Sequence, residues 1–539
     1  MIGLRKPPDS RFGTILDVGA DRHPERPIIT DRPFDIEPDS PCALDYGRWA
    51  QLCHRTSGWL RGAGVEYGDR VAIMKGNHAD VLILACAAAR IGAIPVQLAW
   101  THTPDVTRTL LERMDRPVLV TDRERLESCE LGVEDVGRLT KRTVSVDGSD
   151  GRSDVVALDD LRGEPVPPAR PQPLDQPMIV THTSGTTGAP KLVVHSANTI
   201  DVLAWLETER WPVIGLRSDD TMLFCDPYFH ARLVTGIIAA ATIGPKLLLM
   251  SDPNPETVRT FAGGHRPSVV ETVPNAYLTW EALADDASAP FGNARLFLNT
   301  FDAIHARSVR KLLGASRRRF PVWVQTWGQS EAGPVAIRPY VRQSLRERGR
   351  RMPATRDNGW PTPFFSKVRG VDPDTLEPVP RGEVGLIEVS QPGRCLDYMG
   401  EHDRWENKRR GDWWNTGDLG VISRSRSVRL VDREIDRIPG GESAIELEDV
   451  LLDRLPQATE VVVLAAADGP PVPIVSTVGD EPVRSDEWDA ATADLPTLAP
   501  PHYLPWDEIP RTATWKVRRP MLREQVLPDS AALGYGYWT

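Results

Sequence analysis

The sequence is short of cysteine and has no surplus of positive charge. Six cysteines are scattered over 539 residues without a Cys-x-x-Cys pair. This excludes a disulfide framework and a cysteine-based zinc site, and it predicts reduced thiols in a cytoplasmic protein. The net charge is −11, whereas nucleic-acid-binding proteins normally carry a basic surplus. We therefore expect no nucleic-acid partner.

Long apolar runs are also absent. The first thirteen residues, MIGLRKPPDSRFG, contain no apolar core, so we expect no secretory signal. The most apolar stretches, 81–100 and 233–250, are interrupted by Arg90 and by Gly244-Pro245-Lys246. Because both are too broken for a spanning helix, they predict buried helices followed by strands, and no membrane partner.

The chain contains no internal repeat, and at 539 residues it is too long for one compact core. Apolar spacing predicts helices over 46–64 and 81–92, each followed by a short strand, over 68–73 and 94–98. This alternation predicts an α/β fold with mostly parallel sheets covered by helices. Residues 141–177 are rich in Asp, Gly and Pro, and we expect them to form a surface excursion.

The stretch Thr181–Lys191 reads THTSGTTGAPK and lies between two apolar runs, 178–180 and 192–194. Glycine, serine and threonine offer backbone N–H groups and hydroxyls, which suit a bound phosphate. The glycines and Lys191 do not have the Walker spacing, so this would be a phosphate loop of another kind. An ordinary hairpin connection is the alternative.

The same stretch resembles the TSGTTGxPK signature of the acyl-adenylating superfamily of acid:CoA ligases, adenylation domains and luciferases. The resemblance implies an enzyme that uses ATP and Mg²⁺ to convert an acid into its adenylate, with release of AMP and pyrophosphate. It places in the nucleotide site Thr183, Ser184, Gly185, Thr186, Thr187, Gly188 and Lys191.

Three later motifs carry the same resemblance in the same order. WGQSE resembles the family's Tyr-Gly-x-Thr-Glu. The resemblance implies that Trp327 stacks on adenine and that Gly328, Gln329 and Ser330 border the nucleotide. It also implies that Glu331 binds Mg²⁺ as a catalytic metal ligand. Asp302 and Ala303 correspond to the segment beside adenine. In NTGDL, Asp418 would bind the ribose hydroxyls. Arg433 fits the arginine that contacts ribose or phosphate, and Lys516 in PRTATWK would bridge the acid and the α-phosphate.

The segment Asp226–Arg232 resembles the family's Pro-x-Phe-His sequence at the head of the helix that walls the substrate pocket. His230 would be a gate or hydrogen-bond donor near the carboxylate, and it could equally cap a buried helix. The predicted pocket is lined by Phe229, His230, Arg232, Thr235, Thr300 and Thr326. These mixed side chains suggest a small or aromatic acid.

By the resemblance, a large N-terminal domain of layered, parallel-rich sheets spans residues 1–432, and a small mobile α+β lid domain spans 433–539. Four features depart from the family pattern: Phe301 and Trp515 replace glycines, Ile435 replaces the usual hinge residue, and the loop after Gly440-Gly441 is altered.

Three functional hypotheses remain open. The first, which the motifs favour, is a stand-alone acid ligase whose acceptor is a thiol, either CoA or a free-standing carrier protein. The second is an adenylating tailoring enzyme with an amine acceptor, which includes amide synthetases and enzymes that activate nitrite for diazotisation. The departures above keep it open because they could weaken thioester formation alone. The third is a non-catalytic nucleotide-binding relative, which the retention of Glu331, Asp418, Arg433 and Lys516 disfavours.

Overall fold

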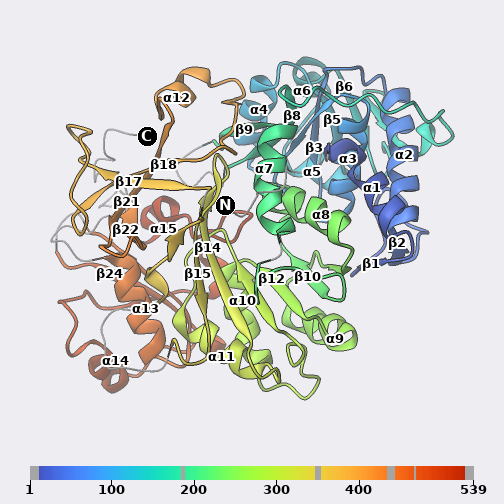
Figure 1. Cartoon of the computed structure of the whole chain (residues 1–539). Helices are drawn as coiled ribbons and strands as arrows, with labels where there is room; N and C mark the ends of the chain where they lie inside the picture. Colours follow the sequence, from blue (N-terminus) through green and yellow to red (C-terminus); the bar gives the residue numbers. More distant parts are fainter. Residues whose placement is uncertain are drawn as a thin grey trace.

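The computed structural model describes residues 11–183, 189–209, 211–345, 354–363, 365–433, 443–466 and 469–528. These residues form a mixed α/β structure with two large parallel-rich sheets, as the sequence predicts (Figure 1). No helix in the described ranges is both long and apolar enough to cross a membrane.

One large sheet has the strand order β19-β9-β8-β4-β3-β5-β6-β7. Strands β3 to β8 run parallel, and β9 and β19 are antiparallel additions. The predicted strands 68–73, 94–98, 178–180 and 192–194 are confirmed as β3, β4, β8 and β9. The predicted surface excursion at 141–177 is wrong in part, because it contains β6 and β7. The bounds are β3 Arg70–Met74, β4 Ile94–Gln97, β5 Val118–Thr121, β6 Arg142–Ser145, β7 Val155–Ala157, β8 Pro177–His182, β9 Leu192–Ser196 and β19 Asp397–Tyr398.

The second large sheet has the order β16-β15-β14-β13-β12-β10-β11-β1-β2, and its central strands are parallel. The carboxyl ends of β12, β13 and β14 therefore meet at one edge, which is where ligands bind in α/β proteins. The bounds are β1 Pro27–Thr30, β2 Ala43–Asp45, β10 Thr221–Cys225, β11 Lys246–Leu249, β12 Val269–Thr272, β13 Leu296–Asn299, β14 Val322–Gln329, β15 Gly333–Tyr340 and β16 Trp360–Pro361.

Helices between and outside the two sheets produce five layers. Alternate strand residues face opposite layers: Met222 and Phe224 join the central core, whereas Leu223 joins the outer one. The central layer holds α1 Ile15–Arg22, α2 Tyr46–Gly62, α3 Asp80–Arg90, α7 Ala197–Thr208 and α8 Ala231–Ile243. The outer layers hold α4 Pro104–Arg113, α5 Arg123–Ser128 and α6 Val133–Leu139 on one side, and α9 Pro255–His265, α10 Pro274–Trp280 and α11 Ala306–Ala315 on the other.

The rest of the chain adds two smaller sheets. The antiparallel strands are β17 Lys367–Val371, β18 Val384–Ser390, β20 Arg409–Arg410, β21 Trp413–Ile422 and β22 Val428–Arg433, with the short helix α12 His402–Glu406. A separate sheet of β23 Ala458–Leu464, β24 Val472–Thr477 and β25 His502–Tyr503 lies with α13 Ala444–Arg454, α14 Ser485–Thr492 and α15 Arg519–Val526 (Figure 1). This α+β part has its own apolar clusters. The domain division at 432/433 stays a prediction.

Candidate functional site

A cavity of about 800 Å³ opens where the carboxyl ends of β12, β13 and β14 meet α7, α8 and the segment that carries Lys516. Pockets between parts of a chain are the usual place for small ligands. Nearly all of the described residues that the sequence predicts for the site line this one cavity. They are Thr183, Lys191, His230, Arg232, Thr235, Thr300, Asp302, Ala303, Thr326, Trp327, Gly328, Gln329, Ser330, Glu331, Asp418 and Lys516.

Phe229 is the exception among the described residues, and its role in the substrate pocket stays a prediction. Its ring is buried and stacks on His182, with 4.5 Å between ring centroids, and it does not line the cavity. Phe229 lies between β10 and α8 and packs with Ala99 and Ala513 in a small apolar cluster. Residues 184–188, Ile435 and Gly440-Gly441 lie outside the described residues, as does the side chain of Arg433.

A bulge in β14 presents the nucleotide-side residues. The pairing of β14 with β15 shifts between Trp327 and Gly328, and a Cβ at Gly328 would lie 2.2 Å from the carbonyl oxygen of Gly333. Only glycine fits this close approach. Gln329 then donates hydrogen bonds to the Thr416 carbonyl at 2.7 Å and to Oδ2 of Asp418 at 3.2 Å. These bonds hold two motifs that are distant in sequence against each other.

Glu331 is 5% exposed and is fixed from two sides. The Tyr398 hydroxyl donates to its Oε1 at 2.5 Å, and its backbone carbonyl accepts from the N–H of Cys395 at 2.7 Å. Burial opposes its charge, but Lys191 and Lys408 hold the pKa of Glu331 below its ordinary value. It is therefore an ionised carboxylate at the cavity wall, which is the ligand type that Mg²⁺ prefers.

Cations gather around Glu331. The pKa of the Lys191 ammonium is lowered to about 8 by burial, together with the charges of Lys408 and Arg404 and against the attraction of Glu331. These three side chains line the cavity together with Arg113. A polyphosphate would relieve their mutual repulsion, so the charge distribution fits the triphosphate of ATP with its Mg²⁺. Thr300 and Thr355 also line the cavity, and their buried hydroxyls have no hydrogen-bond partner among the described residues.

His230 and Lys516 lie on another part of the wall. His230 caps α8, because its Nδ1 accepts a hydrogen bond from the N–H of Arg232 at 3.1 Å. Burial, with the positive charges of Lys516 and Arg232, lowers the pKa of His230 to about 3. The ring is thus neutral, and its proton is on Nε2. His230 can therefore cap α8 through Nδ1 and also donate a hydrogen bond from Nε2, so the two roles predicted from the sequence are compatible.

The segment that carries Lys516 is held by α10, a helix that packs on the sheet containing β12 and β13. Asn275 on α10 donates a hydrogen bond to the carbonyl of Trp515 at 2.7 Å. The Trp515 side chain packs against the same apolar cluster as Phe301, whose ring lies 4.4 Å from that of His230. These contacts place Lys516 at the cavity.

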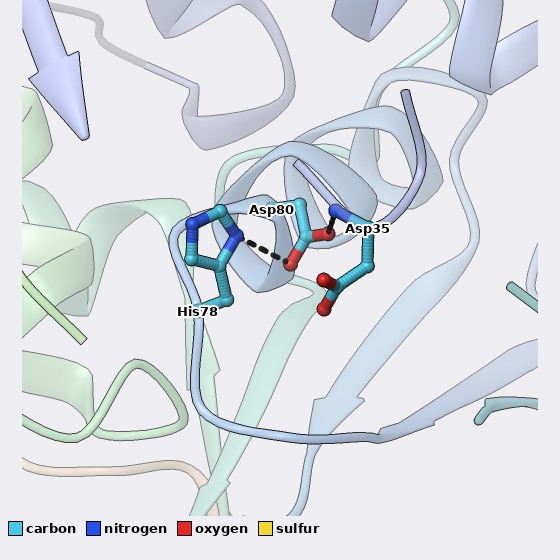
Figure 2. A group of neighbouring side chains, drawn as sticks. All are labelled: Asp35, His78 and Asp80. Carbon is cyan, nitrogen blue, oxygen red and sulfur yellow. Dashed lines mark hydrogen bonds and ion pairs between the residues drawn. The ribbon is translucent and has the colours of Figure 1, made fainter. Parts of the chain in front are cut away.

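A second group of side chains has the composition of a metal site. Asp35, His78 and Asp80 lie within 4.8 Å of one another through their ligand atoms (Figure 2). However, the Lys75 ammonium bonds to Asp35 at 2.5 Å and to Asp80 at 2.8 Å. The lysine supplies the positive charge that the carboxylates need, so this cluster is a buried ion-pair network beneath α3 and carries no metal assignment.

Several residues of the cavity lie outside the motifs that predict the site. Arg404 and Lys408 follow β19, and Glu207 and Glu271 come from α7 and β12. The basic run Lys408-Arg409-Arg410 just before the NTGDL motif is a sequence signal that could have indicated Arg404 and Lys408. Nothing in the local sequence marks the two glutamates.

Comparison with known proteins gives consistent results. The family described as AMP-binding enzyme matches residues 16–399. The chain is 36% identical over 533 residues to a 3-amino-2-hydroxy-4-methoxybenzoate diazotase of Streptomyces cremeus, covering 95% of this chain and 94% of that protein. It is 29% identical over 418 residues to a feruloyl-CoA synthase of Amycolatopsis sp, covering 75% of this chain and 77% of that protein.

Solved structures share the fold at lower identity. The anthranilate CoA ligase AuaEII in complex with anthranoyl-AMP superimposes with a TM-score of 0.80 at 20% identity, covering 97% of this chain and 98% of that one. The amide bond synthetase McbA from Marinactinospora thermotolerans gives a TM-score of 0.74 at 19% identity, covering 96% and 100%. The extent of the family match and the near-full-length relative show that the chain belongs to the AMP-binding enzyme family.

Proposed function

We propose that the protein activates a small acid as its adenylate and transfers the activated group to an aromatic amine, as a diazotase does. The observation that carries the adenylation half is that Lys516, Glu331, Asp418 and a set of phosphate-compatible cations line one cavity. The likeness to a diazotase over nearly the whole chain supports the amine acceptor. The motifs alone favour a thiol acceptor, and the likeness to a feruloyl-CoA synthase keeps CoA as the second candidate.

In the first step, an oxygen of the acid attacks the α-phosphorus of ATP. The new O–P bond forms as the bond to the β-phosphate oxygen breaks, and pyrophosphate leaves. The Lys516 ammonium would neutralise charge that develops on the acid and the α-phosphate, and neutral His230 would donate from Nε2 to an oxygen of the acid. Glu331 would hold Mg²⁺, which supplies charge neutralisation on the phosphates, and Asp418 would accept hydrogen bonds from the ribose hydroxyls.

In the second step, the amine nitrogen attacks the activated atom and AMP leaves with the bonding electrons. If the acid is nitrite, a nitrogen–nitrogen bond forms and the amine loses a proton, which gives an N-nitrosamine. Protonation and loss of water then yield the diazonium ion. We further propose that residues 433–539 form a mobile lid and that Thr183, residues 184–188 and Lys191 bind the phosphates.

The test is AMP and pyrophosphate release from MgATP with nitrite and with a panel of carboxylic acids, each alone, with arylamines and with CoA. We expect turnover that needs an arylamine and ignores CoA. A CoA thioester would move the assignment to an acid:CoA ligase, and no AMP with any acid would contradict both.

Lys516→Ala provides the internal control for adenylation. We expect a rate loss of roughly 10²- to 10³-fold, the usual effect of removing a charge-stabilising group. The matched variant is Lys367→Ala, because Lys367 is an exposed lysine on β17 that does not line the cavity. Equal rates for the two variants would remove Lys516 from the reaction.

A further inference from the structure

Three charged side chains form one part of the cavity wall, and we call them the acidic cluster: Glu207 on α7, Arg232 on α8 and Glu271 on β12. The Arg232 guanidinium donates from Nε and Nη2 to the two oxygens of Glu271, at 2.5 and 2.7 Å. Its Nη1 donates to Oε2 of Glu207 at 2.7 Å and to the Thr235 hydroxyl at 3.2 Å. Every nitrogen of the guanidinium is thus engaged.

The three members differ in how far they face the cavity. The side chain of Glu271 is fully buried, that of Arg232 is 13% exposed, and that of Glu207 is 26% exposed. Glu207 is therefore the member that a ligand in the cavity would touch.

The cluster has an excess of negative charge. Two carboxylates share one guanidinium, whose bidentate contact already satisfies Glu271. Burial and the charge of Glu271 raise the pKa of Asp226 well above its ordinary value, which disfavours a further negative charge beside the cluster. Glu207 is the less completely paired carboxylate, because Arg232 reaches it through Nη1 alone.

This charge distribution constrains the ligand. An anionic substituent would meet the Glu207 carboxylate and would find no free donor on Arg232. A hydrogen-bond donor would satisfy Glu207. The neighbouring wall is apolar and suits an aromatic ring; it includes Leu206, Trp211, Ile214, Met222 and Leu298.

We propose that Glu207 accepts a hydrogen bond from an amino or hydroxyl substituent on an aromatic substrate and so selects substrates that carry such a donor. The inference rests on the proposed function, because it takes the aromatic substrate of that reaction as the occupant. It goes further by naming the substituent and the residue that recognises it.

The energetics of a partly buried carboxylate support this assignment. Burial raises the pKa of Glu207 despite the attraction of Arg232, so its charged form is incompletely solvated. A donor on the ligand would add a hydrogen bond to the Glu207 carboxylate. Since a hydrogen bond to a charged group is worth more than a neutral one, replacing the donor by a methyl group should weaken binding by roughly ten- to a hundredfold.

The experiment measures binding directly and needs no turnover. Isothermal titration with the full-length protein would compare benzoates and anilines that carry an amino, a hydroxyl or a methyl group at each ring position. We expect at least one amino or hydroxyl compound to bind roughly tenfold or more tightly than its methyl counterpart. In Glu207→Gln, which keeps the shape and an acceptor for Arg232, this preference should fall to a few-fold.

The matched control is Asp220→Asn. Asp220 is a buried carboxylate paired with an arginine, Arg295 Nε at 2.8 Å, but it does not line the cavity, so the preference should survive there. An unchanged preference in Glu207→Gln, a methyl preference at every ring position, or no binding by any compound would overturn the inference. Donor-selective binding without adenylation would instead support it and contradict the proposed function.

Discussion

At Phe301 and Trp515 the backbone takes the left-handed conformation that glycine favours, with φ of +73° and +63°. Both positions depart from the glycine of the family pattern, so the backbone keeps the glycine-like conformation although the residue has changed. A side chain in this region costs on the order of 1 kcal/mol. The packing of both rings on one apolar cluster offsets this strain.

This strain gives a prediction for Phe301. We expect the free energy of unfolding of Phe301→Gly to exceed that of Phe301→Ala by about 1 kcal/mol, since both lose the ring but only alanine keeps the strain. Urea unfolding measures the difference. The same pair at Phe320, which is 69% exposed and has no positive φ, should show the opposite order. Equal values at Phe301 would mean that no strain is stored there.

Sequence patterns predicted the residues of this site best where one short motif carries them. Trp327 to Gln329 form the bulged end of β14 and Ser330 and Glu331 the turn after it, so a single motif places all five at the cavity. Phe229 shows the limit: it is adjacent to His230 in sequence, yet its ring stacks on His182 away from the cavity. Adjacency in a turn does not fix side-chain direction, which depends on the packing of the neighbouring elements.

On the scale of elements, α12 and the turn after it form a cationic arm that borders the cavity. Arg404 lies in α12 and Lys408 follows it, and both lower the pKa of Lys191 through their charge. Arg409 is the next residue, but it pairs with Glu406, packs over the Trp405 ring and does not line the cavity. The arm therefore directs two of its cations toward the expected phosphates.

We predict that Lys408→Ala raises the KM for MgATP by roughly tenfold, because it removes one charge-assisted contact to phosphate. The KM for the acid should change much less. Steady-state kinetics with each substrate varied in turn measures both. Arg409→Ala is the matched control and should leave both values near those of the wild type. A similar increase in the two variants would contradict a specific role for Lys408.

Element prediction succeeded for long or strongly apolar segments and failed for short ones. The helices over 46–64 and 81–92 are confirmed as α2 and α3 because several apolar positions repeat in each. The short strands β6 and β7 were not predicted, because they lie among polar and turn residues. The acidic cluster was unpredictable for another reason, since Glu207, Arg232 and Glu271 come from three elements that only the packed fold brings together.

On the scale of the whole molecule, the C-terminal α+β part is held to the large sheets by polar contacts at α11. Arg307 donates hydrogen bonds to the carbonyls of Leu452 and Ala458, at 2.8 and 2.9 Å. The Leu452 carbonyl belongs to the last turn of α13, where carbonyls lack intrahelical partners. Arg310 pairs with Asp453 at 2.6 Å, and His305 Nδ1 bonds Asp449 at 2.5 Å. These contacts join α11 to the C-terminal part of the chain, which also carries Lys516 of the cavity wall.

The His305–Asp449 pair makes this docking dependent on pH. Burial opposes the imidazolium, but the bond to Asp449 and the carboxylates of Glu460 and Glu448 raise the pKa of His305 from 6.5 to about 9. Because the folded state binds this proton more tightly than the unfolded state, the stabilisation is complete below pH 6.5 and disappears as the pH approaches 9. It amounts to at most about 3 kcal/mol.

We therefore predict that the thermal unfolding midpoint of the wild type falls between pH 6.5 and 9 more steeply than that of His305→Asn. The variant should be the less stable protein at pH 6.5, and the two should converge near pH 9 because the wild-type histidine is then uncharged. His502→Asn, at an exposed histidine of β25 in the same C-terminal part, should keep the wild-type slope. Limited proteolysis would report the docking itself, with faster cleavage of the wild type at high pH. Parallel curves for the wild type and His305→Asn would show that Asp449 holds the two parts together without the proton, and the contacts of Arg307 and Arg310 would then be sufficient for docking.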